Sequence, residues 1–295
     1  MSDRTAKYLV TGASGQLGNL VVADLVKTVP AQNVVALVRR PDSAAPLEAL
    51  GVEVRIGTYD DPASLEAAFQ GIDRLLLISA SEMGKRIAQH QNAIDAAKAA
   101  GVGFMAYTSI LRAESTPIGL AAEHRATEDA ITASGLPHAI LRNGWYTENK
   151  TASIAPALEY GAYIGAAGDG RFSSAARLDY AEAAVAVLSA DTVEPGAVYE
   201  LAGDESYTMD EFAAEIASAA GKPVTYADMG EAEFAAALEG AGLPGPIAAM
   251  LADSDASAAK GALEDDSHTL QRLIGRPTTP WTKTVRAAVA DLTSS

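Results

Sequence analysis

The stretch TGASGQLG, residues 11–18, decides the fold. It follows a short apolar run, KYLV, and opens an amphipathic helical pattern. Gly12 permits a tight turn, Gly15 lets the backbone approach a pyrophosphate, and Gly18 lets the helix pack on a sheet. In this context the spacing predicts a dinucleotide site, with phosphates on the amides of 15–17 at the helix N-terminus. A purely structural turn is the alternative.

The first half of the chain alternates short apolar runs with longer helical patterns. Strands are predicted at KYLVTG, NVVALVRR, VEVRIGTY, RLLLISAS, FMAYTS and HAILRNGW. The runs at 8–10, 34–38 and 75–79 are almost wholly apolar, as expected for strands that are covered on both faces. We therefore expect an α/β protein with a Rossmann, doubly wound parallel sheet and helices on both sides.

The composition changes after about residue 150, where Gly-rich loops and Ala-rich helical patterns begin. The segment 176–202 contains RLDYAEAAVAVLS and AVYELAG, which predict one more helix and strand that return to the sheet. We expect a dinucleotide-binding Rossmann domain over 1–150, joined by 176–202. A smaller, discontinuous C-terminal substrate lobe is expected over 151–175 and 203–295.

Charge and composition exclude several classes of function. The chain has 295 residues, 48% of them hydrophobic, and a formal net charge of -16, which argues against a nucleic-acid partner. It has no cysteine, which removes disulfides and thiolate chemistry. His90, His138 and His268 show no ligand spacing with one another, so no metal site is expected. No stretch approaches the ~20 apolar residues of a membrane span, and the N-terminus has no signal core. We expect a cytoplasmic protein without a membrane partner.

Two arginines in VRRP follow the second predicted strand. An NAD-selective site presents a carboxylate here to the ribose 2′-hydroxyl, whereas Arg39, with Arg40 beside it, would hold a 2′-phosphate. The cofactor is therefore expected to be NADP(H), with about a hundredfold or larger preference for NADPH from a fork worth ~3 kcal/mol. A solvated surface arginine is the alternative. Asp42 could pair with either arginine, so the preference need not be absolute.

Ligands of open α/β sheets bind beyond the carboxyl ends of the strands, so other strand ends are candidates. Their positions place two residues near the adenine, three near the linking phosphates and ribose, and three near the nicotinamide. With the glycine turn, the expected cofactor-binding residues are Gly12, Ala13, Ser14, Gly15, Gln16, Leu17, Arg39, Thr58, Tyr59, Ser79, Ala80, Ser81, Thr108, Asn143 and Gly144.

The GxxGxxG spacing resembles that of the short-chain dehydrogenase/reductase superfamily, whose classical members carry Tyr-x-x-x-Lys on the helix after the fifth strand. In that family the tyrosine donates a proton to the substrate oxygen. Here the predicted helix at 119–131, GLAAEHRATEDAI, has His124 at the lysine position and Leu120 at the tyrosine position. A leucine cannot donate a proton.

Further motifs extend the resemblance over nearly the full length: LLLISASE, AYTSIL, AEHRATE, IGAAGDGR, YELAGD and, most specific, LRNGWYTEN at 141–149. The chain resembles the NmrA-like branch, especially the NADPH-dependent quinone oxidoreductases of the QorB type, with triphenylmethane reductase as a near relative. The resemblance implies a Rossmann domain, a small lobe with a substrate pocket between them, and quinone reduction by NADPH. It also implies a wall beside the nicotinamide formed by Asn143, Gly144, Trp145 and Tyr146. Core packing is the alternative for the two aromatic side chains.

Three residues are candidates for a catalytic role. Asn143 could donate a hydrogen bond to a quinone oxygen. Tyr107 is a substitute acid, although its place in an apolar strand favours core packing. His124 is expected to have a positional or proton-supplying role, with Glu128 one turn on as an orienting partner. Core packing is again the alternative for this histidine.

The missing tyrosine narrows the substrate class. Ketone reduction produces an alkoxide that needs a positioned acid, whereas quinone reduction produces a delocalised hydroquinone anion that water can protonate. We therefore expect direct hydride transfer from NADPH to a small planar acceptor such as a quinone, without a flavin. Two alternatives stay open: an NADP(H)-binding redox sensor without turnover, and a reductase of a dye cation or an enone. The natural acceptor is not determined, and a homodimer is also left open.

Overall fold

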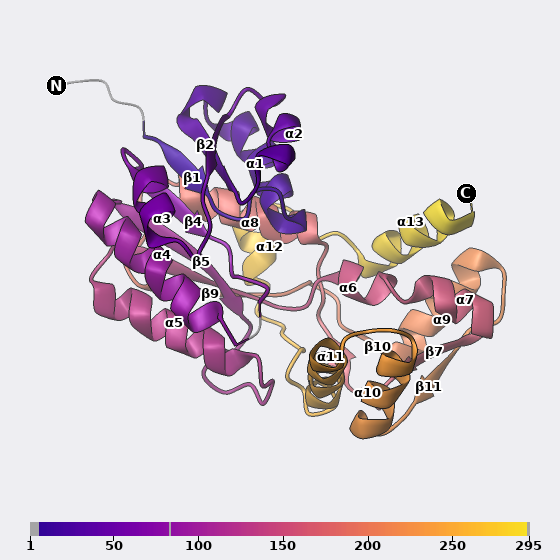
Figure 1. Ribbon diagram of the computed structural model, residues 1–295. Helices are drawn as coiled ribbons and strands as arrows, with labels where there is room; N and C mark the ends of the chain where they lie inside the picture. The colour runs from indigo at the N-terminus through magenta and orange to yellow at the C-terminus, as the bar shows by residue number, and fades with distance from the viewer. Residues whose placement is uncertain (1–5, 83, 294–295) are drawn as a thin grey trace. The chain divides into compact units, whose positions relative to one another are not determined.

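The computed structural model describes residues 6–82 and 84–293 (Figure 1). Its strands are β1 (Tyr8–Val10), β2 (Val34–Val38), β3 (Glu53–Ile56), β4 (Arg74–Leu77), β5 (Phe104–Ile110), β6 (His138–Asn143), β7 (Ala162–Gly165), β8 (Arg171–Phe172), β9 (Ala197–Leu201), β10 (Tyr207–Thr208) and β11 (Thr225–Asp228). Its α-helices are α1 (Gln16–Thr28), α2 (Ala45–Glu48), α3 (Pro62–Phe69), α4 (Arg86–Ala100), α5 (Ala121–Ser134), α6 (Thr147–Thr151), α7 (Ile154–Tyr160), α8 (Arg177–Ser189), α9 (Met209–Ala220), α10 (Glu231–Gly240), α11 (Gly245–Ala258), α12 (Thr269–Ile274) and α13 (Trp281–Thr293). Two short 3₁₀ helices are η1 (Ala31–Asn33) and η2 (Pro41–Ser43).

The chain forms two compact units, each discontinuous in sequence. The first unit contains the chain up to Ile110, then Ala122–Asn143 and Arg177–Tyr199. The second unit contains Leu111–Ala121, Gly144–Ala176 and the chain from Glu200 onward. The two units therefore alternate along the chain. Residues 111–121 and 144–150 belong to the second unit, because the chain leaves the central sheet directly after β5 and β6.

A seven-stranded sheet has the order β3-β2-β1-β4-β5-β6-β9. Neighbouring strands from β3 to β6 pair in parallel, for example Tyr8 with Val34 on one side and with Arg74 on the other. The chain moves outward from β1 first in one direction and then, from β4, in the other. This topology confirms the doubly wound Rossmann sheet, and every strand expected from the sequence is present.

Helices cover both faces of this sheet (Figure 1). On one face α1 and α8 contact each other and the central strands. On the other face α3, α4 and α5 supply apolar side chains to a core shared with the strands, including Phe69, Ile94 and Ile131, each at most 1% exposed. The strands β1 and β2 are buried along their whole length, which explains why their sequences are continuous apolar runs rather than alternating ones.

The second unit has small sheets and a cluster of rings. Strands β7 and β11 pair in parallel, and β8 pairs with β10 in antiparallel fashion. Tyr207 lies in the ring cluster, with its centroid 4.4 Å from that of Trp281 and 5.4 Å from that of Phe212. Nearby, the buried Lys150 forms an ion pair with Asp255. In the described part of the chain, no helix has the length and apolar character needed to cross a membrane.

Candidate dinucleotide-binding site

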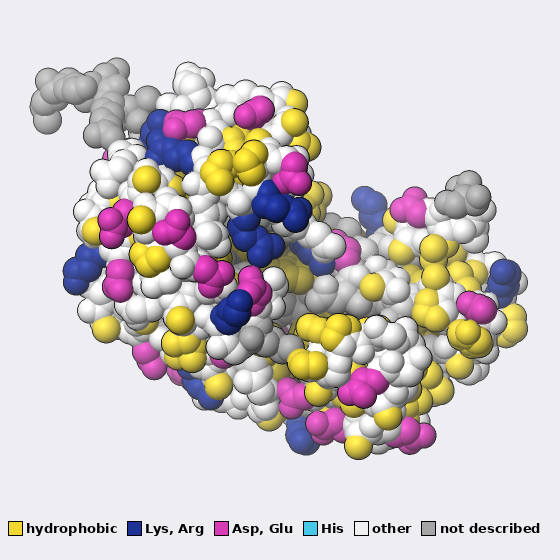
Figure 2. Space-filling view, in the orientation of Figure 1, with side chains coloured by type: hydrophobic (Ala, Val, Ile, Leu, Met, Phe, Trp, Pro, Cys, Tyr) yellow, Lys and Arg dark blue, Asp and Glu magenta, His cyan; other side chains and the backbone are white. Residues whose placement is uncertain are grey.

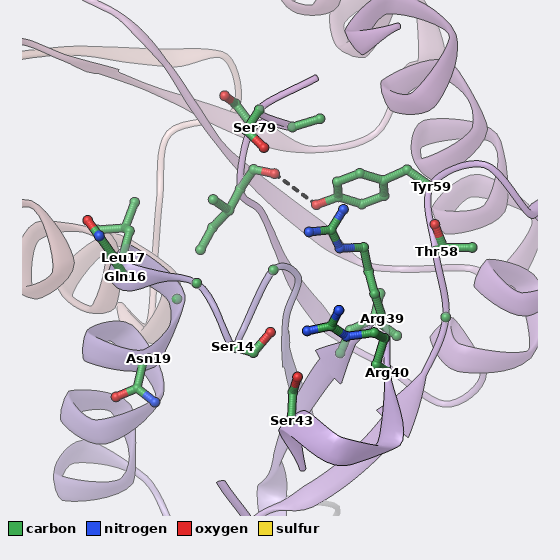
Figure 3. Close-up of a pocket in the computed structure, with 18 of the residues that line it drawn as sticks. Ser14, Gln16, Leu17, Asn19, Arg39, Arg40, Ser43, Thr58, Tyr59 and Ser79 are labelled. Carbon is green, nitrogen blue, oxygen red and sulfur yellow. Dashed lines mark hydrogen bonds between the residues drawn. The ribbon is translucent and has the colours of Figure 1, made fainter. Parts of the chain in front are cut away.

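A cavity of about 600 Å³ opens in the first unit beyond the carboxyl ends of β1, β2 and β4 (Figure 3). This size lies in the range usual for small-molecule sites, and the position is the switch point where the strand order reverses. The lining residues are Gly12, Ser14, Gly15, Gln16, Leu17, Gly18, Asn19, Leu37, Arg39, Arg40, Ser43, Pro46, Gly57, Thr58, Tyr59, Ile78, Ser79, Ala80, Ser81, Glu82 and Gln89.

The glycine turn has the geometry that its spacing predicted. Gly12 has a φ of 58°, in the left-handed region, and its carbonyl accepts a hydrogen bond from the Gly15 amide at 2.9 Å. Gly15 then stands as the N-cap of α1. A Cβ on Gly18 would lie 2.2 Å from the Gly12 carbonyl oxygen, so that only glycine fits there. The turn directs the first amides of α1 at the cavity, where a helix N-terminus favours a phosphate.

The two arginines after β2 lie at the cavity. Figure 3 shows Arg39 and Arg40 extending side by side into it, with the hydroxyls of Ser14 and Ser43 nearby. Basic side chains gather in this region of the surface, below α2 in the view of Figure 2, on a chain with a formal net charge of -16. Two guanidinium groups and two hydroxyls are donors suited to a ribose phosphate, so that the residues present fit an NADP-type dinucleotide.

Each arginine is paired with a carboxylate in this structure. The guanidinium of Arg39 lies 3.4 Å from Glu82, and that of Arg40 lies 3.3 Å from Asp42. The arginine side chains are 70% and 76% exposed, so both pairs are weak by the usual measure of surface ion pairs. The sequence suggested Asp42 as a partner for either arginine, and the structure pairs it with Arg40.

The cavity wall after β4 is held by side chains from other elements. The backbone amides of three successive residues donate hydrogen bonds, each at about 2.9 Å: Ile78 to Thr11 Oγ1, Ser79 to Thr108 Oγ1, and Ala80 to His90 Nε2. These side-chain acceptors replace the sheet ladder where the chain leaves β4. The wall is therefore held by hydrogen bonds within the protein.

Helix α4 makes a second contact with this wall through the buried side chain of Arg86. Its Nε donates to the Ala80 carbonyl at 2.8 Å, and its Nη1 lies 2.6 Å from Glu123. Glu123 also accepts the Gly84 amide at 3.0 Å. The backbone N–H and C=O of Ala80 therefore both form hydrogen bonds with side chains of α4.

Most of the sequence-predicted cofactor residues meet at the cavity, but six of them do not line it. Ala13 is fully buried in the turn, and Thr108 stands behind the wall as the acceptor for Ser79. Asn143 is buried at the end of β6. The remaining three, which belong to the second unit, are Gly144, Trp145 and Tyr146.

The cavity also has lining residues that the sequence reasoning did not propose as cofactor contacts. Ser43 lies in η2 and Pro46 in α2, a few residues after the arginine pair. Their closeness to Arg39 in the sequence could have identified them as cofactor contacts. Glu82 and Gln89 had no such signal, because the turn after β4 and the start of α4 carry no motif. The other unpredicted lining residues are Asn19, Leu37, Gly57 and Ile78.

His124 and Tyr107 form a buried pair within the first unit. His124 Nδ1 lies 2.8 Å from the Tyr107 hydroxyl, and the two residues are 4% and 0% exposed. Burial lowers the pKa of His124 to about 3, and burial also raises the pKa of Tyr107 far above its usual value. At neutral pH the histidine is therefore uncharged and the tyrosine is protonated. The burial of Tyr107 agrees with the core-packing interpretation of its strand.

The prediction that Glu128 orients His124 is wrong. Glu128 accepts hydrogen bonds from Arg142, with the shortest at 2.6 Å, and from the Ser109 hydroxyl, so its carboxylate is committed to those groups. A buried carboxylate is stabilised by a guanidinium fork far better than by a neutral imidazole. Helix α5 also begins at Ala121, so that Leu120 precedes the helix rather than lying on its face.

A parallel sheet with a glycine turn and paired arginines at its switch point defines a dinucleotide-binding protein of the Rossmann class. Among residues 6–82 and 84–293, no three His, Asp or Glu side chains gather as a metal site would require. A family model described as NAD(P)H-binding matches residues 12–191, and the chain belongs to this family.

Known proteins resemble the chain over nearly its full length. Quinone oxidoreductase 2 of Escherichia coli K12 is 54% identical over 276 residues, which cover 94% of this chain and 96% of that protein. A crystal structure of an E. coli NADPH-dependent quinone oxidoreductase complexed with NADPH matches with a TM-score of 0.92 and 54% identity, covering 95% of this chain and 99% of that one. Triphenylmethane reductase of Citrobacter sp., complexed with NADP(H), matches with a TM-score of 0.91 and 38% identity, covering 96% and 100%. These matches confirm the resemblance that the sequence motifs indicated.

Proposed function

We propose that the protein is an NADPH-dependent oxidoreductase that reduces quinones. The observation that carries the proposal is the cavity itself, in which the glycine turn and two arginines converge as an NADP-type dinucleotide requires. The relative at 54% identity is named quinone oxidoreductase 2, which supports the acceptor class. When bound, NADPH supplies a hydride, so that NADPH, a quinone and one proton become NADP⁺ and a hydroquinone.

The chain's residues bind and orient the cofactor in this proposal. The amides at the start of α1 receive the linking phosphates, and Arg39 receives the 2′-phosphate. The wall at 78–80 keeps its position because Thr11, Thr108 and His90 accept its amides. Catalysis then depends mainly on proximity and orientation.

Proton supply is assigned to solvent. His124 is neutral and buried against Tyr107, so neither residue is placed to deliver a proton to an acceptor. A hydroquinone anion can take its proton from water, which makes a quinone a better substrate than a ketone. We propose that His124 acts as a positioning residue through Tyr107, and we expect His124→Ala to slow quinone reduction modestly.

Asn143, Trp145 and Tyr146 are proposed as acceptor-side residues. The basis is their place in LRNGWYTEN, the most specific stretch of the resemblance. If they contact the acceptor, Asn143→Ala and Trp145→Leu should raise the quinone KM more than the NADPH KM.

The decisive experiment mixes the pure protein and NADPH with 1,4-benzoquinone, naphthoquinones and methyl ketones, and follows NADPH oxidation. We expect turnover with the quinones and none with the ketones. Activity on ketones alone would contradict the proposal, as would NADPH binding without any acceptor-dependent oxidation. A homodimer also stays a prediction, which light scattering during gel filtration tests.

A further inference from the structure

Glu82 is an acid in the wall of a cavity that fits a polyanion. It lines the cavity in the turn after β4, and its side chain is 38% exposed. One carboxylate oxygen lies 3.4 Å from Arg39 Nη1, and the other lies 3.0 Å from Lys85 Nζ. The proposed binding of NADPH gives this carboxylate no role, and its negative charge has the same sign as the phosphates of that ligand.

The contact between Glu82 and Arg39 joins the ends of two different strands. Arg39 follows β2 and Glu82 follows β4, and the two side chains meet at the cavity that both line. The guanidinium of Arg39 is also the group that we propose receives the 2′-phosphate. One guanidinium edge cannot give its donors to both anions, so the phosphate and the carboxylate compete for it.

We propose that Glu82 limits the preference for NADPH over NADH by competing with the 2′-phosphate for Arg39. NADH has a hydroxyl in place of that phosphate, so that its binding leaves the ion pair intact. NADPH must displace Glu82, which keeps Lys85 as its other partner after release. This inference rests on the proposed binding of NADPH and is independent of the acceptor.

The expected effect is small, because the pair is exposed. Surface ion pairs contribute at most ~1 kcal/mol, which corresponds to about a fivefold change in affinity. Direct repulsion between the Glu82 carboxylate and the phosphate is the rival explanation, because it would also favour NADH but would not need Arg39. Salt screens both effects.

Glu82→Gln tests the proposal, because it removes the charge and keeps the shape. The matched control is Glu66→Gln on α3, an exposed acid outside the cavity lining whose substitution changes the net charge equally. Dissociation constants are measured without an acceptor, by calorimetry or fluorescence, for NADPH, NADH, 2′,5′-ADP and 5′-AMP. We expect Glu82→Gln to bind NADPH and 2′,5′-ADP about three- to fivefold tighter than the control does, with NADH and 5′-AMP changed less than twofold.

The double variant Arg39→Ala with Glu82→Gln separates competition from a general field. Without Arg39 there is nothing to compete for, so Glu82→Gln should then give no gain beyond that of Glu66→Gln. The proposal is overturned if Glu82→Gln weakens NADPH, matches the control, or strengthens NADH and 5′-AMP equally. If the wild-type protein binds no NADPH, the proposed function fails first, and this result is distinct from an unchanged Glu82→Gln.

Discussion

The backbone amide of Ala80 donates a hydrogen bond to Nε2 of His90 at 2.9 Å, which ties the cavity wall to helix α4. The ring is fully buried, and burial lowers its pKa to about 3, so that Nε2 stays an acceptor at neutral pH. The proton therefore sits on Nδ1, 3.0 Å from the Thr127 hydroxyl, which donates in turn to the Glu123 carbonyl. The tautomer of His90 is fixed in this way because a backbone N–H can only donate, so Nε2 must carry no proton.

Two substitutions of His90 separate its two hydrogen bonds. In His90→Gln the amide oxygen can take the place of Nε2 and still accept from Ala80, whereas in His90→Asn the side chain reaches only the Nδ1 position. We expect His90→Asn to raise the NADPH KM about three- to tenfold, from the loss of one buried hydrogen bond, with kcat nearly unchanged. His90→Gln should stay close to wild type. Steady-state kinetics with NADPH varied decide this, and equal losses in both variants would mean that His90 is only a packing residue.

Arg39→Ala is expected to raise the dissociation constant of NADPH about ten- to a hundredfold and to leave that of NADH within about twofold. The reason is that only NADPH carries the phosphate that the guanidinium binds. Arg286→Ala is the control, since Arg286 is exposed in the second unit and its loss changes the net charge equally. Fluorescence titration with both dinucleotides measures the effect. Unchanged NADPH affinity would show that Arg39 does not contact the phosphate.

The buried histidines make stability depend on pH in a defined window. His90 and His124 have pKa values lowered to about 3, whereas unfolded histidine titrates near 6.5. Between these values the unfolded chain binds more protons than the native one, so the free energy of unfolding falls as pH drops below about 6.5. At pH 5 each group should cost about 2 kcal/mol relative to pH 7.

Urea unfolding at pH 7 and pH 5 tests this dependence, with the double variant His90→Gln and His124→Asn as comparison. The wild-type protein should lose more stability than the double variant over this interval. Glu53 does not affect this comparison. Its hydrogen bond to Arg55 lowers its pKa, so its contribution to stability is lost only as the pH falls below the ordinary pKa of a glutamate. Parallel losses in both proteins would show that the histidines are not the source.

Gly18→Ala is expected to destabilise the protein by about 3 kcal/mol and to abolish NADPH binding. The added Cβ would lie 2.2 Å from the Gly12 carbonyl oxygen and 2.8 Å from Ala13 Cα, so the turn would have to move. Gly101→Ala is the matched control: it has a φ of 72° and open space around it, and should cost only about 1 kcal/mol without altering binding. Thermal melts and NADPH titrations compare the two variants, and equal behaviour would refute the packing role of Gly18.

Local patterns predicted the parts of the site whose function depends on residues adjacent in sequence. The turn at 11–18 has its geometry set within eight positions, and Arg39 follows a strand directly, so both could be identified without a structure. The inner strands β1 and β2 were equally accessible, because burial on both faces of the sheet leaves continuous apolar runs. The boundaries of the two units were less accessible, since 111–121 has no compositional mark.

The role of His124 shows where local patterns stop. Its position on a helix after the fifth strand was correct, but Glu128, one turn on, is held by Arg142 from β6. The actual partner, Tyr107, comes from β5. Which of several polar side chains meet depends on how α5 packs on the sheet, and no spacing along the chain encodes that.

The amino-acid sequence by itself determined the doubly wound sheet, the glycine turn at its switch point and the arginines that suit a 2′-phosphate, because each depends on periodicity or on neighbours within a few residues. Only the tertiary structure decided that Glu82 faces Arg39, that His90 holds the Ala80 amide, and that His124 is buried and neutral. These relationships join residues from separate elements. Their chemistry depends on burial and on distances across the fold, which exist only after the helices have packed on the sheet.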